Sequence, residues 1–351
     1  MNRIKGEAYF GKSTKKLLHI IPKGAIIILE HEDIDIVAAE EMVRKGVKAV
    51  INTKISVTGK IPRSGVDHLL HFGIPVFDLD QPKMKLGNLL DITVIEDKLF
   101  QRKGQDWVLV GDLVPYTLDF FQKKISEGRL NYPELYKHFV ANSFNFAEKE
   151  MELFLKFINQ LPILPEIKGK NVFIIARGAS LEEDIRMARP LLKNPDCVVL
   201  AVDGASVLLS EYNIKPEYII GDMDSIPEDV TKYQCRFISH SYLNGTSPGQ
   251  ERLKKLSIES EAIPFPGLSE DLAIMLAYVS QAQHIYTIGC RTSVVELVEK
   301  GRKGMGSTLL TRMYVGDKVS DIKQIHRLVS LSKIPFFYDQ SMNYDDGVSN
   351  K

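Results

Sequence analysis

Short apolar runs alternate with longer, periodically apolar segments over the first eighty residues. The run at 25–29 is uninterrupted and predicts a buried strand. Apolar residues at helical spacing over 34–45 predict a helix with Asp33 as its N-cap and Gly46 as its end. Similar patterns predict strands over 47–51 and 74–77 and a helix over 65–72. This βαβαβ order favours a parallel sheet with helices packed on it.

The pattern changes in the next seventy residues. Strand-like runs at 92–95 and 107–110 predict a small β element. Two helices are predicted, over 116–124 and over 132–160, and the second has apolar residues on a helical period. The proline-containing segment 161–165 ends this helix, since proline cannot continue it.

Strands and helices alternate again in the remainder of the chain. Strands are predicted over 171–176, 197–202, 218–221, 237–238, 262–265 and 284–288, and helices over 181–192, 205–212 and 271–280. This order predicts a doubly wound α/β domain with a mostly parallel sheet. In such sheets, ligands bind outside the carboxyl ends of the strands.

The predicted elements divide the chain of 351 residues into four parts. They are an N-terminal α/β domain with the small β element over 1–110, a helical connector over 111–165, the doubly wound domain over 166–330 and a polar tail over 331–351. The length suits two domains better than one, and an apolar content of 44% is enough for sizeable cores.

The charge balance of the chain argues against nucleic acid as a partner. Lys plus Arg and Asp plus Glu number 45 each, so the net charge is zero, and a general nucleic-acid binder is not expected. The three cysteines lie far apart and form neither a metal-spaced pair nor a disulfide framework. We find no signal sequence and no membrane segment, and therefore expect a soluble, cytoplasmic protein.

Carboxylates follow two of the predicted strands of the doubly wound domain. Asp203 comes directly after one strand, and Asp222 and Asp224 come after the next. Two carboxylates one residue apart on a turn can share Mg²⁺, which prefers oxygen ligands and leaves room for phosphate oxygens. Gly204 and Gly221 permit tight turns and close approach of a ligand there. A solvated turn is the alternative for one Asp-x-Asp pair, but several acidic strand ends converge here.

These acids lie in segments that resemble the catalytic domain of thiamin pyrophosphokinases. The segments are Ala-Val-Asp-Gly-Ala at 201–205 and Lys-Pro-Glu-Tyr-Ile-Ile-Gly-Asp-Met-Asp-Ser at 215–225, and Ser-Glu-Asp at 269–271 takes the place of a helix-opening Thr-Asp. The resemblance implies that Asp222, Asp224 and Asp271 are catalytic and that Asp203, Asp222 and Asp224 hold Mg²⁺. It also implies that Asp203, Gly204, Gly221 and Ser225 bind ATP or another nucleotide.

Further segments extend the resemblance over nearly the whole chain. They lie at 31–40, 49–52, 73–78, 247–253 and 299–308. Together they are similar to SteA-type cytokinetic-ring proteins, which join an N-terminal domain to a pyrophosphokinase-like one. The resemblance implies a protein that binds a nucleotide or diphosphate and acts in cell division or envelope maintenance through a partner in the division machinery. We also expect a homodimer.

One segment departs from the thiamin pyrophosphokinase pattern. The Arg-x-Asp-His motif of that family is replaced at 289–296, and a predicted helix over 294–300 stands where a β-sandwich that helps to hold thiamin would follow. Two alternatives to a binding protein stay open. One is an active Mg²⁺-dependent diphosphotransferase that moves a diphosphate from ATP to a small alcohol, and the other is a scaffold whose acidic loop is empty.

Basic and hydroxyl side chains near the expected ligand edge are secondary candidates. Arg302, Ser307 and Thr308 lie in or beside a glycine-containing loop that can hold phosphate oxygens. A surface turn beside a basic helix end is the alternative for this loop. Arg252 can pair with a phosphate, or it can form a salt bridge at a helix cap.

Overall fold

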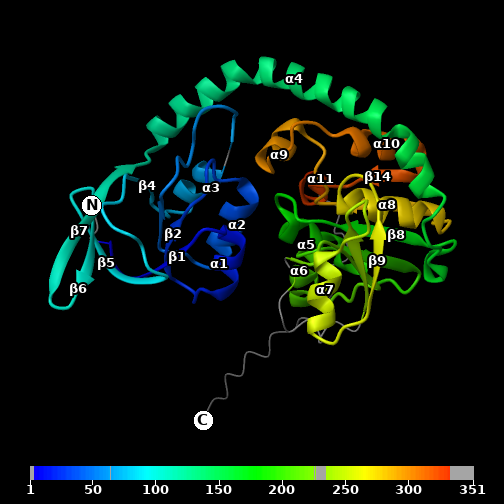
Figure 1. Ribbon diagram of the computed structural model, residues 1–351, viewed down its shortest axis with the longest axis horizontal. Helices are drawn as coiled ribbons and strands as arrows, with labels where there is room; N and C mark the ends of the chain where they lie inside the picture. Colours follow the sequence, from blue (N-terminus) through cyan, green and yellow to red (C-terminus); the bar gives the residue numbers. More distant parts are fainter. Residues whose placement is uncertain (1–3, 64, 225, 227–234, 333–351) are drawn as a thin grey trace, which may run out of the picture.

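The computed structural model describes residues 4–63, 65–224, 226 and 235–332 and has two lobes joined by one long helix (Figure 1). We call 4–115 the barrel lobe and 165–332 the sheet lobe. Helix α4 (Leu118–Ile158) arches over both lobes. Within the described ranges, no helix has both the length and the apolar character needed to cross a membrane.

Seven strands of the barrel lobe form a closed sheet. They are β1 (Ile4–Gly11), β2 (Ile26–Leu29), β3 (Ala49–Asn52), β4 (Val76–Asp80), β5 (Leu89–Ile95), β6 (Lys98–Lys103) and β7 (Asp106–Pro115). β1 to β4 are parallel, whereas β5, β6 and β7 are antiparallel and close the barrel where β5 pairs with β1. The small β element predicted within the N-terminal domain corresponds to β5, β6 and β7, which continue the parallel strands into one closed sheet. The sequence did not predict β1, because this strand has no apolar run, and β1 is the partner that β5 needs.

The barrel strands have apolar side chains on both faces. Ile26 and Ile28 pack inside the barrel, and Ile27 and Leu29 pack outside against the helices α1 (Thr14–Ile20), α2 (Ile36–Arg44) and α3 (Gly65–His71). Burial of both faces explains the uninterrupted apolar run of β2.

Helix α2 begins two residues later than predicted. Its N-cap is Asp35, whose Oδ1 accepts from Ala38 N at 3.0 Å. Asp33 has φ 57°, and its carboxylate accepts from the backbone and hydroxyl of Thr58 instead. The prediction that Asp33 caps this helix is therefore wrong. Asp33 and Asp35 can both cap a helix, and the sequence does not show that Asp33 is held instead by the loop at Thr58.

Helix α4 is one continuous helix of 41 residues, although the sequence predicted two helices. Phe121 and Ile125 pack into the core of the barrel lobe, and Phe154 and Phe157 pack into the core of the sheet lobe. The stretch around Pro133 is mostly exposed. The predicted gap between the two helices lies at 125–131, where Gly128 and Asn131 have low helix propensity, and Pro133 itself falls within the second predicted helix.

Seven parallel strands form the sheet of the sheet lobe, in the order β12-β11-β10-β9-β8-β13-β14. They are β8 (Asn171–Ile175), β9 (Cys197–Val202), β10 (Tyr218–Gly221), β11 (Arg236–Ser241), β12 (Ser260–Pro264), β13 (His284–Ile288) and β14 (Val319–Asp321). The chain runs outward from β8 to β12 and then returns to the other side of β8 with β13. Ligands of such sheets bind near this reversal of strand order.

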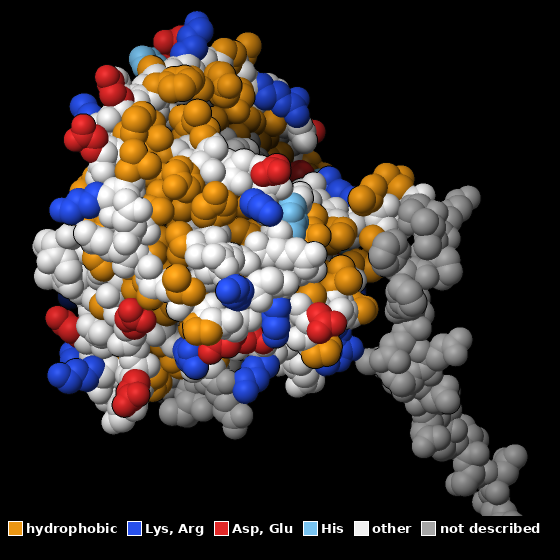
Figure 2. All heavy atoms as spheres, turned by 90° about the vertical axis from the view of Figure 1, so that its right-hand side faces the viewer, with side chains coloured by type: hydrophobic (Ala, Val, Ile, Leu, Met, Phe, Trp, Pro, Cys, Tyr) orange, Lys and Arg blue, Asp and Glu red, His pale blue; other side chains and the backbone are white. Residues whose placement is uncertain are grey.

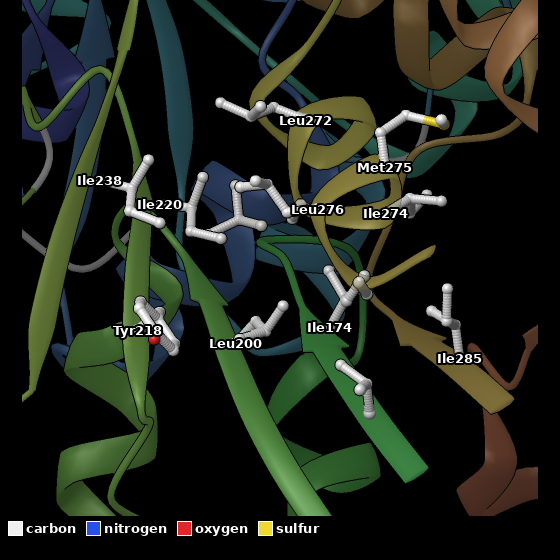
Figure 3. Close-up of a cluster of buried hydrophobic side chains, with 14 of the residues drawn as sticks. Ile174, Leu200, Tyr218, Ile220, Ile238, Leu272, Ile274, Met275, Leu276 and Ile285 are labelled. Atoms are coloured by element: carbon white, nitrogen blue, oxygen red, sulfur yellow. The ribbon is translucent and has the colours of Figure 1, made fainter. Parts of the chain in front are cut away.

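Helices cover both faces of this sheet. The helices of the sheet lobe are α5 (Leu181–Leu192), α6 (Ala205–Glu211), α7 (Pro248–Lys255), α8 (Ser269–Val279), α9 (Val294–Glu299), α10 (Gly306–Val315) and α11 (Ile325–Ser332), with 3-10 turns at Pro165–Ile167 and Gly316–Lys318. Leu272 and Leu276 of α8 pack on Ile220 and the strands beside it (Figure 3). α5, α6 and α7 pack on the opposite face. The α/β class is confirmed, and the doubly wound pattern holds for the sheet lobe alone.

Candidate functional site

Three acidic side chains lie together at the carboxyl ends of two neighbouring strands. Asp203 follows β9, and Asp222 and Asp224 follow β10, which pairs with β9. An Asp203 carboxylate oxygen accepts from Met223 N at 3.0 Å, and Asp222 Oδ1 accepts from Asp224 N at 3.1 Å. These bonds orient the two carboxylates on adjoining turns, as the strand order predicts. Ser225 lies outside the described residues.

The acids carry more negative charge than their surroundings neutralise. Burial and the charge of Asp222 together raise the pKa of Asp203 to about 8, against the opposing effects of the Met223 amide and the charge of Lys15. Burial also raises the pKa of Asp222, and Asp224 adds to the rise. A divalent cation would offset this charge, so the residues fit Mg²⁺. Across the described ranges, no three His, Cys, Asp or Glu side chains are already placed to hold a metal ion.

Both lobes line the cleft onto which the acids open. Its volume is about 1080 Å³, and nine carboxyl groups line it. The cationic side chains on its walls are Lys12, Lys15, Arg177, Arg291, Lys300 and Arg302. Phosphate-bearing ligands commonly require such cations beside metal-binding carboxylates.

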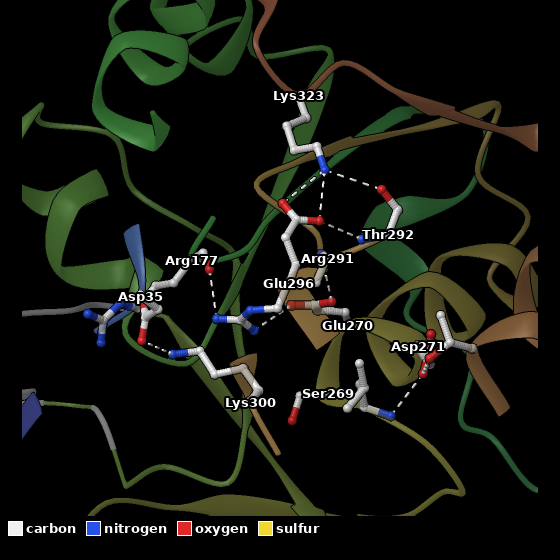
Figure 4. A network of polar contacts seen from close by, with 12 residues as sticks. Asp35, Arg177, Ser269, Glu270, Asp271, Arg291, Thr292, Glu296, Lys300 and Lys323 are labelled. Carbon is white, nitrogen blue, oxygen red and sulfur yellow. Dashed lines mark hydrogen bonds and ion pairs between the residues drawn. The ribbon is translucent and has the colours of Figure 1, made fainter. Parts of the chain in front are cut away.

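Ion pairs join the lobes along this cleft. Arg177 Nη2 lies 2.5 Å from Glu41 Oε2, and Lys300 Nζ lies 3.1 Å from Asp35 Oδ2. Arg291 donates to the backbone oxygen of Arg177 at 2.9 Å, which connects the loop after β13 with the loop after β8 (Figure 4). The cleft therefore has charged walls that are held by partners in both lobes.

Three predicted site residues lie beneath the cleft rather than on its surface. Asp271 is 1% exposed, and its Oδ2 accepts from Leu268 N at 2.8 Å and from Thr308 Oγ1 at 2.7 Å. Ser307 Oγ donates to Glu150 Oε2 at 2.5 Å. Burial raises the pKa of Asp271 to about 6. These side chains cap α8 and join it to α10 and α4.

Of the other predicted site residues, one lines the cleft and the rest support the loops that carry the acids. Arg302 lines the cleft. Arg252 donates to the backbone oxygens of Met223 and Ile226, so it holds the acidic loop. Gly204 is the N-cap of α6. A Cβ on Gly221 would lie 2.0 Å from Asp203 Oδ1, so this glycine is needed for close packing.

The structure adds residues that the sequence did not predict. Lys15 contacts Asp224 at 2.5 Å. His240 Nε2 lies 2.8 Å from the oxygen of Phe265, and His240 Nδ1 lies 3.2 Å from Ser269 Oγ. Both His240 and Ser269 line the cleft. The position of His240 at the end of β11 was a usable signal, whereas Lys15 could not be placed because β1 was missed.

Comparisons with known proteins give limited similarity. No protein-family model matches the chain, and no curated protein matches it. The solved structures that are similar to part of the chain include a thiamin pyrophosphokinase from Geobacillus thermodenitrificans, at 18% identity and a TM-score of 0.27, and a thiamine pyrophosphokinase from Bacillus subtilis, at 19% identity and a TM-score of 0.26, each over 43% of this chain. The matches span 58% and 59% of those two chains, less than two thirds of their length.

Proposed function

We propose that this protein binds a nucleotide or another diphosphate-bearing ligand together with Mg²⁺ at the acidic end of the cleft. The observation that carries the proposal is the meeting of Asp203, Asp222 and Asp224 at the ends of β9 and β10, on a cleft of about 1080 Å³ with cationic walls. The raised pKa of buried Asp203 supports it, because a bound cation would offset the charge that is otherwise unfavourable there.

In this proposal, the chain's own residues position the ligand. Asp203, Asp222 and Asp224 would hold the metal, which would supply positive charge against the phosphate oxygens. Arg302 on the cleft wall is placed for the remaining phosphate charge, whereas Arg291 is paired with Glu270. Arg252 fixes the backbone of the acidic loop and thereby the direction of its carboxylates.

We base a proposed biological setting on the resemblance of the segments at 31–40, 247–253 and 299–308. They support a place among SteA-type proteins, and hence a cytoplasmic role in cell division or envelope maintenance through a protein partner. A homodimer is also proposed. Apolar side chains gather on the outer face of the sheet lobe (Figure 2), and Met151, Leu155 and Met313 are exposed on α4 and α10.

Thermal unfolding with and without Mg²⁺-ATP and Mg²⁺-GTP tests ligand binding. A nucleotide at 100 times its Kd should stabilise the wild type by about 2.7 kcal/mol. Asp222→Asn/Asp224→Asn should gain nothing from either nucleotide, because the metal ligands are lost. Asp196→Asn/Asp317→Asn, which changes two exposed acids outside the cleft, should respond as the wild type does. No response of the folded wild type to any nucleotide would refute the proposal.

A second candidate is diphosphate transfer from ATP to a small alcohol, and the His240–Ser269 contact favours it. The oxygen of Phe265 accepts only, so His240 Nε2 carries a proton. Burial lowers the pKa of His240, so Nδ1 of the neutral ring accepts from Ser269 Oγ and can take an alcohol proton through it. AMP release from ATP across a panel of alcohols, absent in His240→Gln, would support an enzyme. Absence of turnover with every alcohol would favour the binding protein.

A further inference from the structure

A lysine of the barrel lobe lies at the acidic end of the cleft. Lys15 Nζ is 2.5 Å from Asp224 Oδ1, although the two residues belong to different lobes. Asp203 and Asp222 line the same cleft as Lys15 and Asp224. One cation from the barrel lobe therefore lies in the cleft with all three carboxylates to which we assign the metal.

The backbone that carries Lys15 is held firmly. Ser13 caps α1, and its Oγ accepts from Lys16 N. Thr14 Oγ1 lies 2.9 Å from His31 Nδ1, and Leu17 packs in the core of the barrel lobe. The first turn of α1 is thereby fixed, and the flexible part of Lys15 is its side chain.

Folding stability does not account for this ion pair. The side chain of Asp224 is 58% exposed and that of Lys15 is 32% exposed, and water screens such pairs strongly. Ligand binding suits Lys15 better. An ammonium group has three donors on a flexible stem, so it can contact a carboxylate and a phosphate oxygen at the same time.

We propose that Lys15 is a diphosphate-binding residue, through which the barrel lobe completes a site whose carboxylates come from the sheet lobe. This inference rests on the proposed function. When a metal-bound diphosphate occupies the acidic end of the cleft, Lys15 Nζ donates to a phosphate oxygen and Asp224 contributes to the metal. The ligand class is a diphosphate group, either free or carried by a nucleotide, and tight binding requires both lobes.

Calorimetric titration of the full chain with Mg²⁺ plus inorganic pyrophosphate, and with Mg²⁺ plus ADP, tests the inference. Lys15→Ala should raise the Kd of both ligands about tenfold, as loss of a charged hydrogen bond does. Lys15→Arg keeps a cation and should stay within about threefold of the wild type. Lys16→Ala removes the same charge from the exposed side of α1, outside the cleft, and should bind as the wild type does.

The titration distinguishes failure of the proposed function from failure of the assignment of Lys15. If the folded wild type binds neither ligand, the proposed function fails and the assignment of Lys15 fails with it. If the wild type binds and Lys15→Ala binds equally tightly, only the assignment of Lys15 is overturned. Equal losses in Lys15→Ala and Lys16→Ala would also overturn it, because the effect would then come from net charge. Unfolding temperatures check that each variant is folded.

Discussion

At the scale of single residues, the close approach of two strand ends shapes the acidic site. A Cβ on Gly221 would lie 2.0 Å from Asp203 Oδ1, within the space that the carboxylate occupies. Asp203 itself has φ 46° and accepts from Met223 N at 3.0 Å. The absence of a side chain at 221 therefore lets the carboxylate of Asp203 point across the end of β10.

We predict that Gly221→Ala displaces Asp203 from the amide of Met223. The added methyl group overpacks the site and removes a hydrogen bond, and together these effects should cost about 1–3 kcal/mol of stability. Gly87→Ala is the matched control, because its Cβ would meet no atom closer than 3.9 Å. Urea unfolding of both variants measures the difference. Wild-type stability of Gly221→Ala would contradict the close approach.

The acidic strand ends were predictable from the sequence, whereas the direction of many neighbouring side chains was not. Each acid follows an apolar run, and parallel strands bring their carboxyl ends to one edge. Asp271 and Thr308 lie at the starts of helices near the same edge, but they point into the packing of α8 against α10. That orientation depends on contacts between distant segments, which single-residue patterns do not contain.

At the scale of elements, one stretch of α4 is supported mainly by its own backbone hydrogen bonds. Residues 129–138 are mostly exposed, and Pro133 lies within them. Proline has no N–H to donate and its ring crowds the preceding turn. The sequence correctly predicted helical residues on both sides of the segment 125–131. It did not reveal their continuity, because the two ends are anchored in different lobes.

Pro133→Ala should stabilise the protein by about 1–3 kcal/mol, because alanine restores the missing backbone hydrogen bond and has the higher helix propensity. Glu134→Ala changes the neighbouring exposed position and should alter stability by less than about 0.5 kcal/mol. Guanidinium unfolding of the two variants provides the comparison. A neutral or destabilising effect of Pro133→Ala would argue against a continuous α4.

At the scale of the whole molecule, charged side chains of α2 connect the lobes. Arg44 Nη1 donates to both carboxylate oxygens of Glu211 at 2.7 and 2.6 Å. Both carboxylate oxygens of Glu40 accept from Ser180 N at 3.0 Å. These contacts were beyond prediction from the sequence, because they depend on how one lobe faces the other. They also make the junction sensitive to pH.

Burial raises the pKa of Glu40 from 4.5 to about 7, against the opposing hydrogen bond from Ser180. The folded state therefore holds this proton more tightly than the unfolded state. The resulting stabilisation is fully present below about pH 4.5 and is lost as the pH rises through 7. Glu40→Gln keeps the acceptor without the charge. Relative to the wild type, it should gain about 1–2 kcal/mol between pH 5 and pH 8, after allowance for screening.

Urea unfolding of the wild type and Glu40→Gln at both pH values measures this gain. Glu134→Gln, at an exposed position on α4, controls for the loss of one negative charge. A stability difference between Glu40→Gln and the wild type that is the same at both pH values would show that Glu40 has an ordinary pKa.

The sharing of α4 between two cores also limits how such a chain can be assembled by recombination. Phe121 and Ile125 complete one core, and Phe154 and Phe157 complete the other. A break inside α4 would leave each fragment with only part of the helix, and short isolated helices have marginal stability in water. The barrel lobe could therefore pass to a new protein only with α4 whole. The domain joined to it would then need an apolar groove that accommodates Phe154 and Phe157. We therefore expect the two lobes to be inherited together.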